Sequence, residues 1–76
     1  MRIQYETRIG GDVFYFADLD TAKTAWRTAL EAYHYDSVEF TEDKAGDIFV
    51  FGEFDKAGRG RRSLARGIIS KIEIKE

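Results

Sequence analysis

The stretch DVFYFADLDTAKTAWRTALEAY at residues 12–33 decides the fold, because its hydrophobic period changes within a few residues. Val13 to Ala17 form a continuous apolar run, which predicts a strand with apolar side chains on both faces. From Leu19 to Tyr33 apolar residues recur at spacings of three and four, which predicts an amphipathic helix. Asp18 or Asp20 is expected to cap its first turn. A strand followed directly by a helix is the prediction.

This central unit gives two further expectations. The strand should lie centrally in a sheet or face a partner on its second side, because both of its faces are apolar. The helix should bury one stripe against the sheet, and its alanines should allow a close approach. The predicted stripe consists of Leu19, Ala22, Trp26, Ala29, Leu30 and Tyr33.

Strands are predicted on both sides of this unit. Residues 2–9 alternate between polar and apolar, and Gly10-Gly11-Asp12 follows as a tight turn. After the helix, residues 37–41 alternate in the same way. Residues 42–47 read as a turn, and residues 48–54 form a second apolar run.

The C-terminal part of the chain allows two interpretations. The segment KAGRGRRSLARG at 56–67 combines glycine with five Lys and Arg residues, and we expect a mobile basic loop there. The period of two at residues 68–75 predicts a fifth strand. The competing interpretation starts a helix at Ser63, with Leu64, Ile68 and Ile72 on one face. We prefer the strand, because the last residues are rich in β-branched side chains.

The predicted fold class is therefore α+β, as one domain over residues 1–76 that includes the basic loop 56–67. An antiparallel sheet of four to five strands, in the order ββαββ with a fifth strand after it, carries one helix on one face. Because one helix covers only one side of such a sheet, either some aromatic residues are exposed or two copies pack together.

Composition narrows the location and the class of protein. The chain has no cysteine, which favours a reducing compartment. It has neither the apolar run of a signal peptide at its start nor a stretch of about 20 apolar residues for a membrane span. We expect a soluble, cytoplasmic protein, in a host cell if a phage encodes it.

Charge is divided unevenly along the chain. Residues 1–55 contain 5 Lys and Arg against 12 Asp and Glu, whereas residues 56–76 contain 7 against 2. This asymmetry is the global feature that most strongly suggests a binding function.

The sequence contains few residues that could act in catalysis. Without cysteine, and with His34 as the only histidine, neither a Cys–His pair nor a multi-histidine metal site can form within one chain. His34 follows the helix, where its side chain is favourably placed against the helix dipole. We predict no enzyme, no catalytic residue, no metal site and no cofactor.

The basic segment supplies the first candidate binding residues. Arginine offers a planar pair of donors to phosphate or carboxylate, and neighbouring glycines let a ligand approach the backbone. Binding to nucleic acid, binding to an acidic protein and a loop that merely balances charge all remain open. The candidates are Arg59, Arg61, Arg62 and Arg66.

Acidic residues around the second predicted hairpin form a second candidate surface. They lack the spacing and central glycine of a calcium loop. Either they are the solvated residues of a hairpin, or they imitate nucleic-acid phosphates toward a basic protein. The candidates are Glu39, Glu42, Asp43 and Asp47.

One resemblance spans Val13 to Val50, about half of the chain. It rests on the strand FYFA, the helix TAKTAWRTALEAY and the hairpin VEFTEDKAGDIFVF. In this arrangement the chain resembles small phage-encoded inhibitor proteins of the anti-CRISPR type. The resemblance implies a stoichiometric inhibitor that covers a functional surface of a host defence complex, and it transfers no functional residue.

These observations predict a non-enzymatic protein-binding inhibitor or regulator that blocks a CRISPR-type nucleoprotein complex through charged surfaces. The first alternative is a nucleic-acid-binding module that uses the arginines of residues 59–66. The second alternative is a structural homo-oligomer, for which a homodimer is the simplest form. No membrane partner is expected.

Overall fold

A computed structural model describes residues 2–55 and 62–75 of the chain. Its elements follow the order ββαβββ: β1 (Arg2–Ile9), β2 (Asp12–Phe16), α1 (Leu19–Ala32), β3 (Ser37–Glu42), β4 (Ile48–Asp55) and β5 (Arg62–Ile74). The predicted α+β class, the fifth strand and the single helix before the last three strands are thereby confirmed for the described residues.

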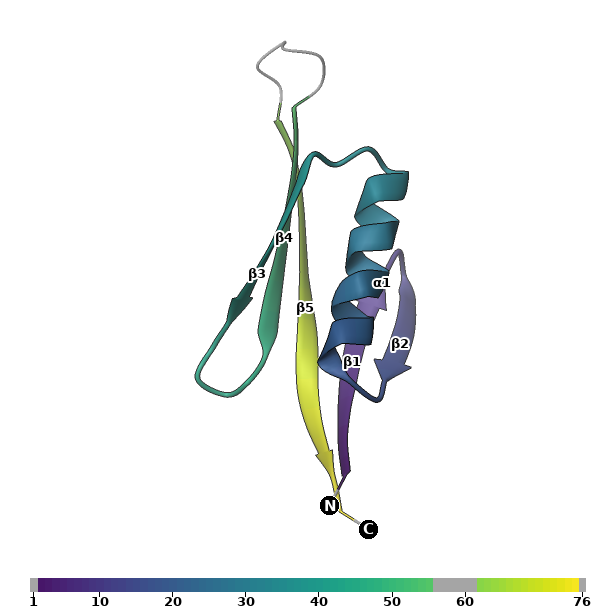
Figure 1. The fold of residues 1–76 in the computed structure, drawn as a ribbon, viewed down its shortest axis with the longest axis vertical. Coiled ribbons are helices and arrows are strands. Elements are labelled where there is room, and N and C mark those ends of the chain that lie inside the picture. The colour runs from purple at the N-terminus through teal and green to yellow at the C-terminus, as the bar shows by residue number, and fades with distance from the viewer. Residues whose placement is uncertain (1, 56–61, 76) are drawn as a thin grey trace.

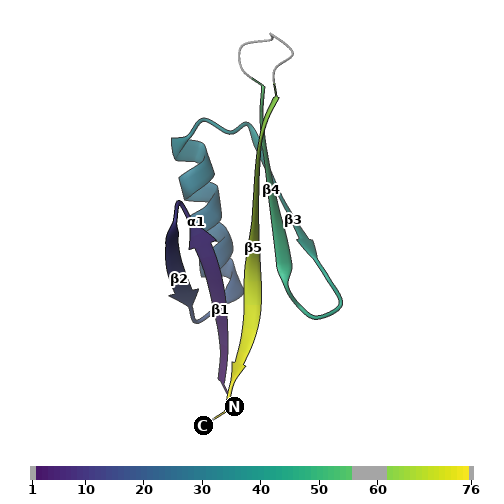
Figure 2. The ribbon, with the colours of Figure 1, turned by 180° about the vertical axis from the view of Figure 1, so that it is seen from behind.

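The five strands form one antiparallel sheet with the order β2-β1-β5-β4-β3 (Figure 1). β5 pairs with β1 on one side and with β4 on the other. The β1–β2 hairpin and the β3–β4 hairpin are therefore joined in the sheet only through β5. Viewed from behind, α1 lies beyond β1 and β2, so the helix covers one face of the sheet (Figure 2).

The helix begins as its sequence predicts. Asp18 is the N-cap, and its carboxylate accepts hydrogen bonds from the backbone N–H of Thr21 at 2.8 Å and from the Thr21 hydroxyl. These bonds favour the ionised carboxylate and hold the pKa of Asp18 below its ordinary value of 3.8. Asp18, rather than Asp20, therefore supplies the capping oxygen.

The helix ends in a Schellman motif. The backbone N–H of Tyr35 donates to the carbonyl of Leu30, and that of His34 donates to the carbonyl of Glu31, both at 3.0 Å. His34 has a φ of 65°, the left-handed conformation that this motif requires and that glycine adopts more easily.

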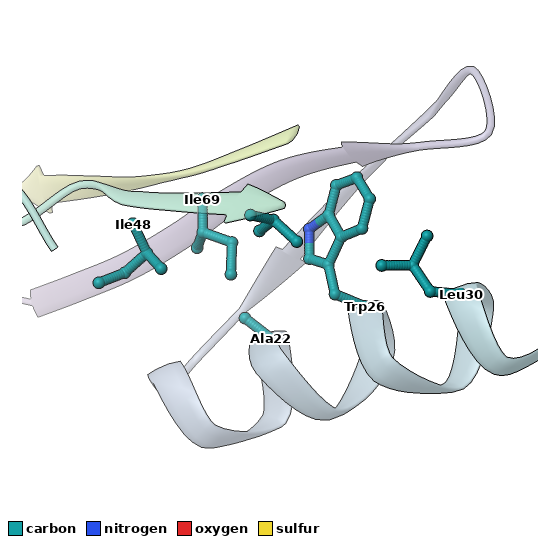
Figure 3. Close-up of a cluster of buried hydrophobic side chains, with 6 residues drawn as sticks. Ala22, Trp26, Leu30, Ile48 and Ile69 are labelled. Carbon is teal, nitrogen blue, oxygen red and sulfur yellow. The ribbon is translucent and has the colours of Figure 1, made fainter. Parts of the chain in front are cut away.

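Three helix residues and three sheet residues form the buried core, as Figure 3 shows for five of them. Close packing at this layer explains the alanine at position 22, which is fully buried. The core residues are Ala22, Trp26, Leu30, Ile48, Val50 and Ile69.

Trp26 packs directly on the backbone of β5. A Cβ atom added to Gly67 would lie 2.3 Å from two carbons of the indole ring, so only glycine leaves room for it. The sequence contains Gly67 because of this contact, since its backbone needs no left-handed conformation.

Two sequence-based expectations were wrong, at residues 62–67 and at Tyr33. Residues 62–67 belong to β5 and not to a loop, because Gly67 serves the Trp26 contact and does not form a turn. For β2, two positions were expected, and the sheet order excludes the central one because β2 is an edge strand. Tyr33 is 70% exposed, because the helix has already ended at that residue.

Candidate functional site

The sheet divides in two beyond the middle of β5. Pairing between β1 and β5 ends at Thr7 and Ile69, whereas pairing between β4 and β5 continues to Asp55 and Arg62. Both ribbon views show β1 and β5 side by side near the chain ends and separating toward the β1–β2 turn (Figures 1 and 2). We call this separation the split. Along it, residues 64–68 of β5 have a strand partner on the β4 side alone, within the part of the chain that the structure describes.

Thr7 closes the foot of the split. Its buried hydroxyl accepts a hydrogen bond from the indole Nε1 of Trp26 at 2.8 Å and donates one to the carbonyl oxygen of Ile68 at 2.7 Å. The Thr7 hydroxyl thus donates to the Ile68 carbonyl, which is the first carbonyl group of β5 beyond its pairing with β1. The hydrogen bond to Thr7 also fixes the indole ring of Trp26, which lines a pocket in the split.

A pocket of about 660 Å³ fills the split. Helix side chains and aromatic rings form its apolar lining, and the glycines of the β1–β2 turn form one edge. Both glycines have positive φ values, 63° at Gly10 and 93° at Gly11, so the turn is tight and adds no side chain to the opening. The pocket lining includes Trp26, Ala29, Leu30, Tyr33, Tyr35 and Ala65.

Two arginines flank this pocket from opposite strands. Arg8 near the end of β1 and Arg66 on β5 both line it, and both are exposed. Their neighbours Thr7 and Gly67 face the helix, so alternation places both guanidinium groups on the opposite face of the sheet. Neither forms an ion pair with another described residue. The site therefore combines an apolar cavity with two available cations.

The face of the sheet turned away from α1 is apolar at its centre. Phe49 on β4 and Ile68 on β5 lie opposite each other in register and are 47% and 42% exposed. Val13 shares a hollow of about 200 Å³ with Ile68, lined also by Glu6, Arg8 and Ser70, and Leu64 lies further along β5 on the same face, beyond Arg66. We call Val13, Phe49, Leu64 and Ile68 the open-face cluster. Of the two alternatives expected for this uncovered face, exposed aromatic residues or a second copy packed on it, the single chain shows Phe49 exposed, and the second alternative stays a prediction.

The four predicted arginines fall into three groups. Arg66 is the one that belongs to the pocket. Arg62 begins β5, but its side chain lies outside the described part, and Arg59 and Arg61 lie wholly outside the described residues.

The acidic candidates do not form one cluster. Glu39 lies on the open face of β3, opposite Phe51, whereas Glu42 at the end of β3 lies on the helix side, opposite Ile48. Both are exposed. The two faces of one strand thus separate these carboxylates.

Asp43 and Asp47 have structural roles in the β3–β4 turn. One oxygen of Asp43 accepts hydrogen bonds from the N–H groups of Ala45 and Asp47 at 2.9 and 3.0 Å. One oxygen of Asp47 accepts from the N–H of Lys71 on β5 at 2.9 Å. These bonds support the interpretation of this segment as a structural hairpin.

Two cations cover the aromatic ring at the other edge of the sheet. Lys23 Nζ and the guanidinium carbon of Arg27 lie 5.6 and 5.0 Å from the centre of the Phe40 ring, on the helix side. Phe40 is therefore shielded, in contrast to Phe49 on the other face.

No group of three or more His, Asp or Glu side chains among the described residues could hold a metal ion. In the part that the structure describes, no helix has the length and apolar character that crossing a membrane requires. Comparison of the chain with protein-family models, curated proteins and solved structures found no match.

Sequence reasoning missed Arg8 and the pocket. The alternation over residues 2–9 places Arg8 on the polar face of a strand, and nothing local in the sequence indicates that the neighbouring strand diverges there. Two features of the sequence could together have indicated the pocket. They are the single tryptophan in the helix and a glycine within an otherwise β-forming run, since a large ring often packs where a strand lacks a side chain.

Proposed function

We propose that this chain is a non-enzymatic protein-binding module that inhibits or regulates a larger assembly by covering one of its surfaces. The observation that carries the proposal is the open-face cluster. Contiguous apolar surface on a small soluble domain often marks a binding site. Burying one such side chain fully contributes about 1.5–3 kcal/mol, so a few of them can anchor a partner.

The surroundings of the cluster also suit a protein partner. Arg66 lies between Leu64 and Ile68 on β5, Arg8 lies opposite Val13, and Glu39 lies beyond Phe51 on β3. Charges around an apolar centre typically set the orientation of a partner and exclude others.

Affinity capture tests this function. Tagged wild-type protein is incubated with a lysate of the organism in which it acts, and bound proteins are quantified by mass spectrometry. Phe49→Asp should abolish recovery of the partner, whereas Thr24→Asp should retain it. Thr24 is an exposed residue of α1, on the other side of the sheet from Phe49, so it controls for added charge.

Circular dichroism of both variants controls for folding. A partner that folded Phe49→Asp retains at full recovery would contradict the use of this face. The same would follow if wild-type protein recovered nothing at stoichiometric amounts.

The narrower proposal, an inhibitor of a CRISPR-type defence complex, is supported by the sequence resemblance alone. Expression of the chain in a bacterium with an active CRISPR system should restore plaque formation by a targeted phage. Unchanged plaque numbers across the main CRISPR types would refute it.

A nucleic-acid-binding function is the second candidate. It is favoured by two arginines, Arg8 and Arg66, at a pocket that is also lined by Tyr33 and Tyr35, because bases stack on aromatic rings beside phosphate-binding cations. The net charge of −2 counts against it. Titration of labelled DNA and RNA at about 50 and about 200 mM salt tests whether the chain binds nucleic acid, since phosphate contacts weaken steeply over that range.

A further inference from the structure

The split exposes backbone donors and acceptors along β5. The carbonyl of Ile68 points toward β1, because the Thr7 hydroxyl reaches it. N–H and C=O groups of a strand alternate in direction from residue to residue, so those of Arg66 and Leu64 point the same way. Beyond Thr7 and Ile69 no described strand pairs with this edge. From Leu64 to Ile68 it extends for about 13 Å, enough for a short added strand.

The two sides of the split differ in chemistry. On the helix side, an added strand would meet the apolar lining formed by Trp26, Leu30 and Ala65. On the open side, it would lie between Arg8 and Arg66, which come from the strands on either side of the split. Successive side chains of a strand point to opposite faces, so the matching partner alternates between apolar and acidic residues.

We propose that the split binds an extended peptide segment of alternating apolar and acidic residues, which adds to the β5 edge as an antiparallel or parallel strand. This inference rests on the proposed protein-binding function and specifies the chemistry of a partner segment. Main-chain hydrogen bonds to β5 provide binding, the pocket selects apolar side chains, and the two arginines select carboxylates.

The test uses the full chain and a synthetic probe. The probe is a blocked heptapeptide with glutamate at alternate positions, two leucines and a central phenylalanine between them. Trp26 is the only tryptophan of the chain and lines the pocket, so its fluorescence reports occupancy. We expect saturable binding with a shift of Trp26 emission, and at least tenfold slower exchange of the Leu64 and Arg66 amides.

Two altered peptides test the mode of binding with wild-type protein. One replaces every glutamate by lysine, and the other carries N-methyl groups on alternate amides along the edge that faces β5. Both should bind at least about tenfold more weakly, because the first loses the arginine contacts and the second loses the backbone contacts. Equal binding of either peptide would overturn the proposal.

Charge reversal provides a matched test on the protein. The double variant Arg8→Glu, Arg66→Glu should bind the glutamate peptide at least about tenfold more weakly and prefer the lysine peptide. Both residues are exposed, so the fold should persist. If wild-type protein ignores the glutamate peptide, this inference fails, whereas the proposed function is judged separately by Phe49→Asp.

Discussion

The indole Nε1 of Trp26 donates a hydrogen bond of 2.8 Å to the hydroxyl of Thr7, and that hydroxyl donates in turn to the carbonyl of Ile68. One side chain thereby satisfies a helix residue and a strand residue at once. Thr7→Val should lower the free energy of unfolding by about 2 kcal/mol, because it leaves two buried polar groups unpaired. Urea denaturation measures this loss. Thr7→Ser keeps the hydroxyl and should lose clearly less, and equal losses would show that the hydrogen bonds contribute little.

Replacing Gly67 by alanine should destabilise the fold by more than about 2 kcal/mol, since the new methyl group would overlap the ring of Trp26. Gly52→Ala is the matched control on the neighbouring strand. There the nearest atom is the Cδ1 end of Leu30 at 3.0 Å, which can move aside. Thermal unfolding of both variants should therefore give a much lower midpoint for Gly67→Ala, and similar midpoints would contradict the packing described for Trp26.

Asp18 should make stability depend on acid pH. Its pKa is lowered in the folded protein by the hydrogen bonds from Thr21, so its contribution is present above the ordinary value of 3.8. That contribution is lost as the pH falls below 3.8 and through the lowered pKa. Asp18→Asn keeps a capping oxygen but cannot titrate, so urea midpoints measured from neutral to acid pH should fall less steeply for it. Parallel curves would exclude this role.

His34→Gly should raise the free energy of unfolding by about 0.5–1 kcal/mol, because glycine adopts a φ of 65° without steric cost. His34→Ala retains the Cβ atom and should bring no such gain. If chemical denaturation finds both variants less stable than the wild type, the histidine side chain itself stabilises the helix end.

Asp47 should contribute more to the stability of the fold than Glu39 and Glu42 do. Its carboxylate accepts the Lys71 N–H on β5, so Asp47→Ala should cost about 1 kcal/mol of unfolding free energy. Glu39→Ala and Glu42→Ala should be close to neutral, since both residues are exposed on β3. Three equal losses in urea denaturation would indicate a general charge effect instead.

Local periodicity was sufficient to predict most of the fold. The alternation in β1, the stripe of α1 and the apolar runs of β2 and β4 each depend on neighbours in sequence, which is why they were readable. The beginning of β5 was not, because Arg66 and Gly67 have the composition of a loop and their role depends on the distant Trp26.

The candidate site was less accessible to sequence reasoning. Arg66 was identified from its basic segment, but its counterpart Arg8 lies 58 positions earlier in the chain and meets it only where the sheet divides. Carboxylates such as that of Asp43 were predicted to bind a partner, although one oxygen of Asp43 accepts two backbone hydrogen bonds within the turn. Pairing distances and hydrogen-bond partners of this kind are properties of the tertiary structure.

The position of β5 also has a consequence for biosynthesis. It is the last strand in chain order, yet it connects the two hairpins of the sheet. On the ribosome, β1–β2 and β3–β4 can each form early, but they cannot join until β5 has emerged. Contacts as distant as Arg2 with Ile74 must then form late, which predicts folding at the modest rates typical of high contact order.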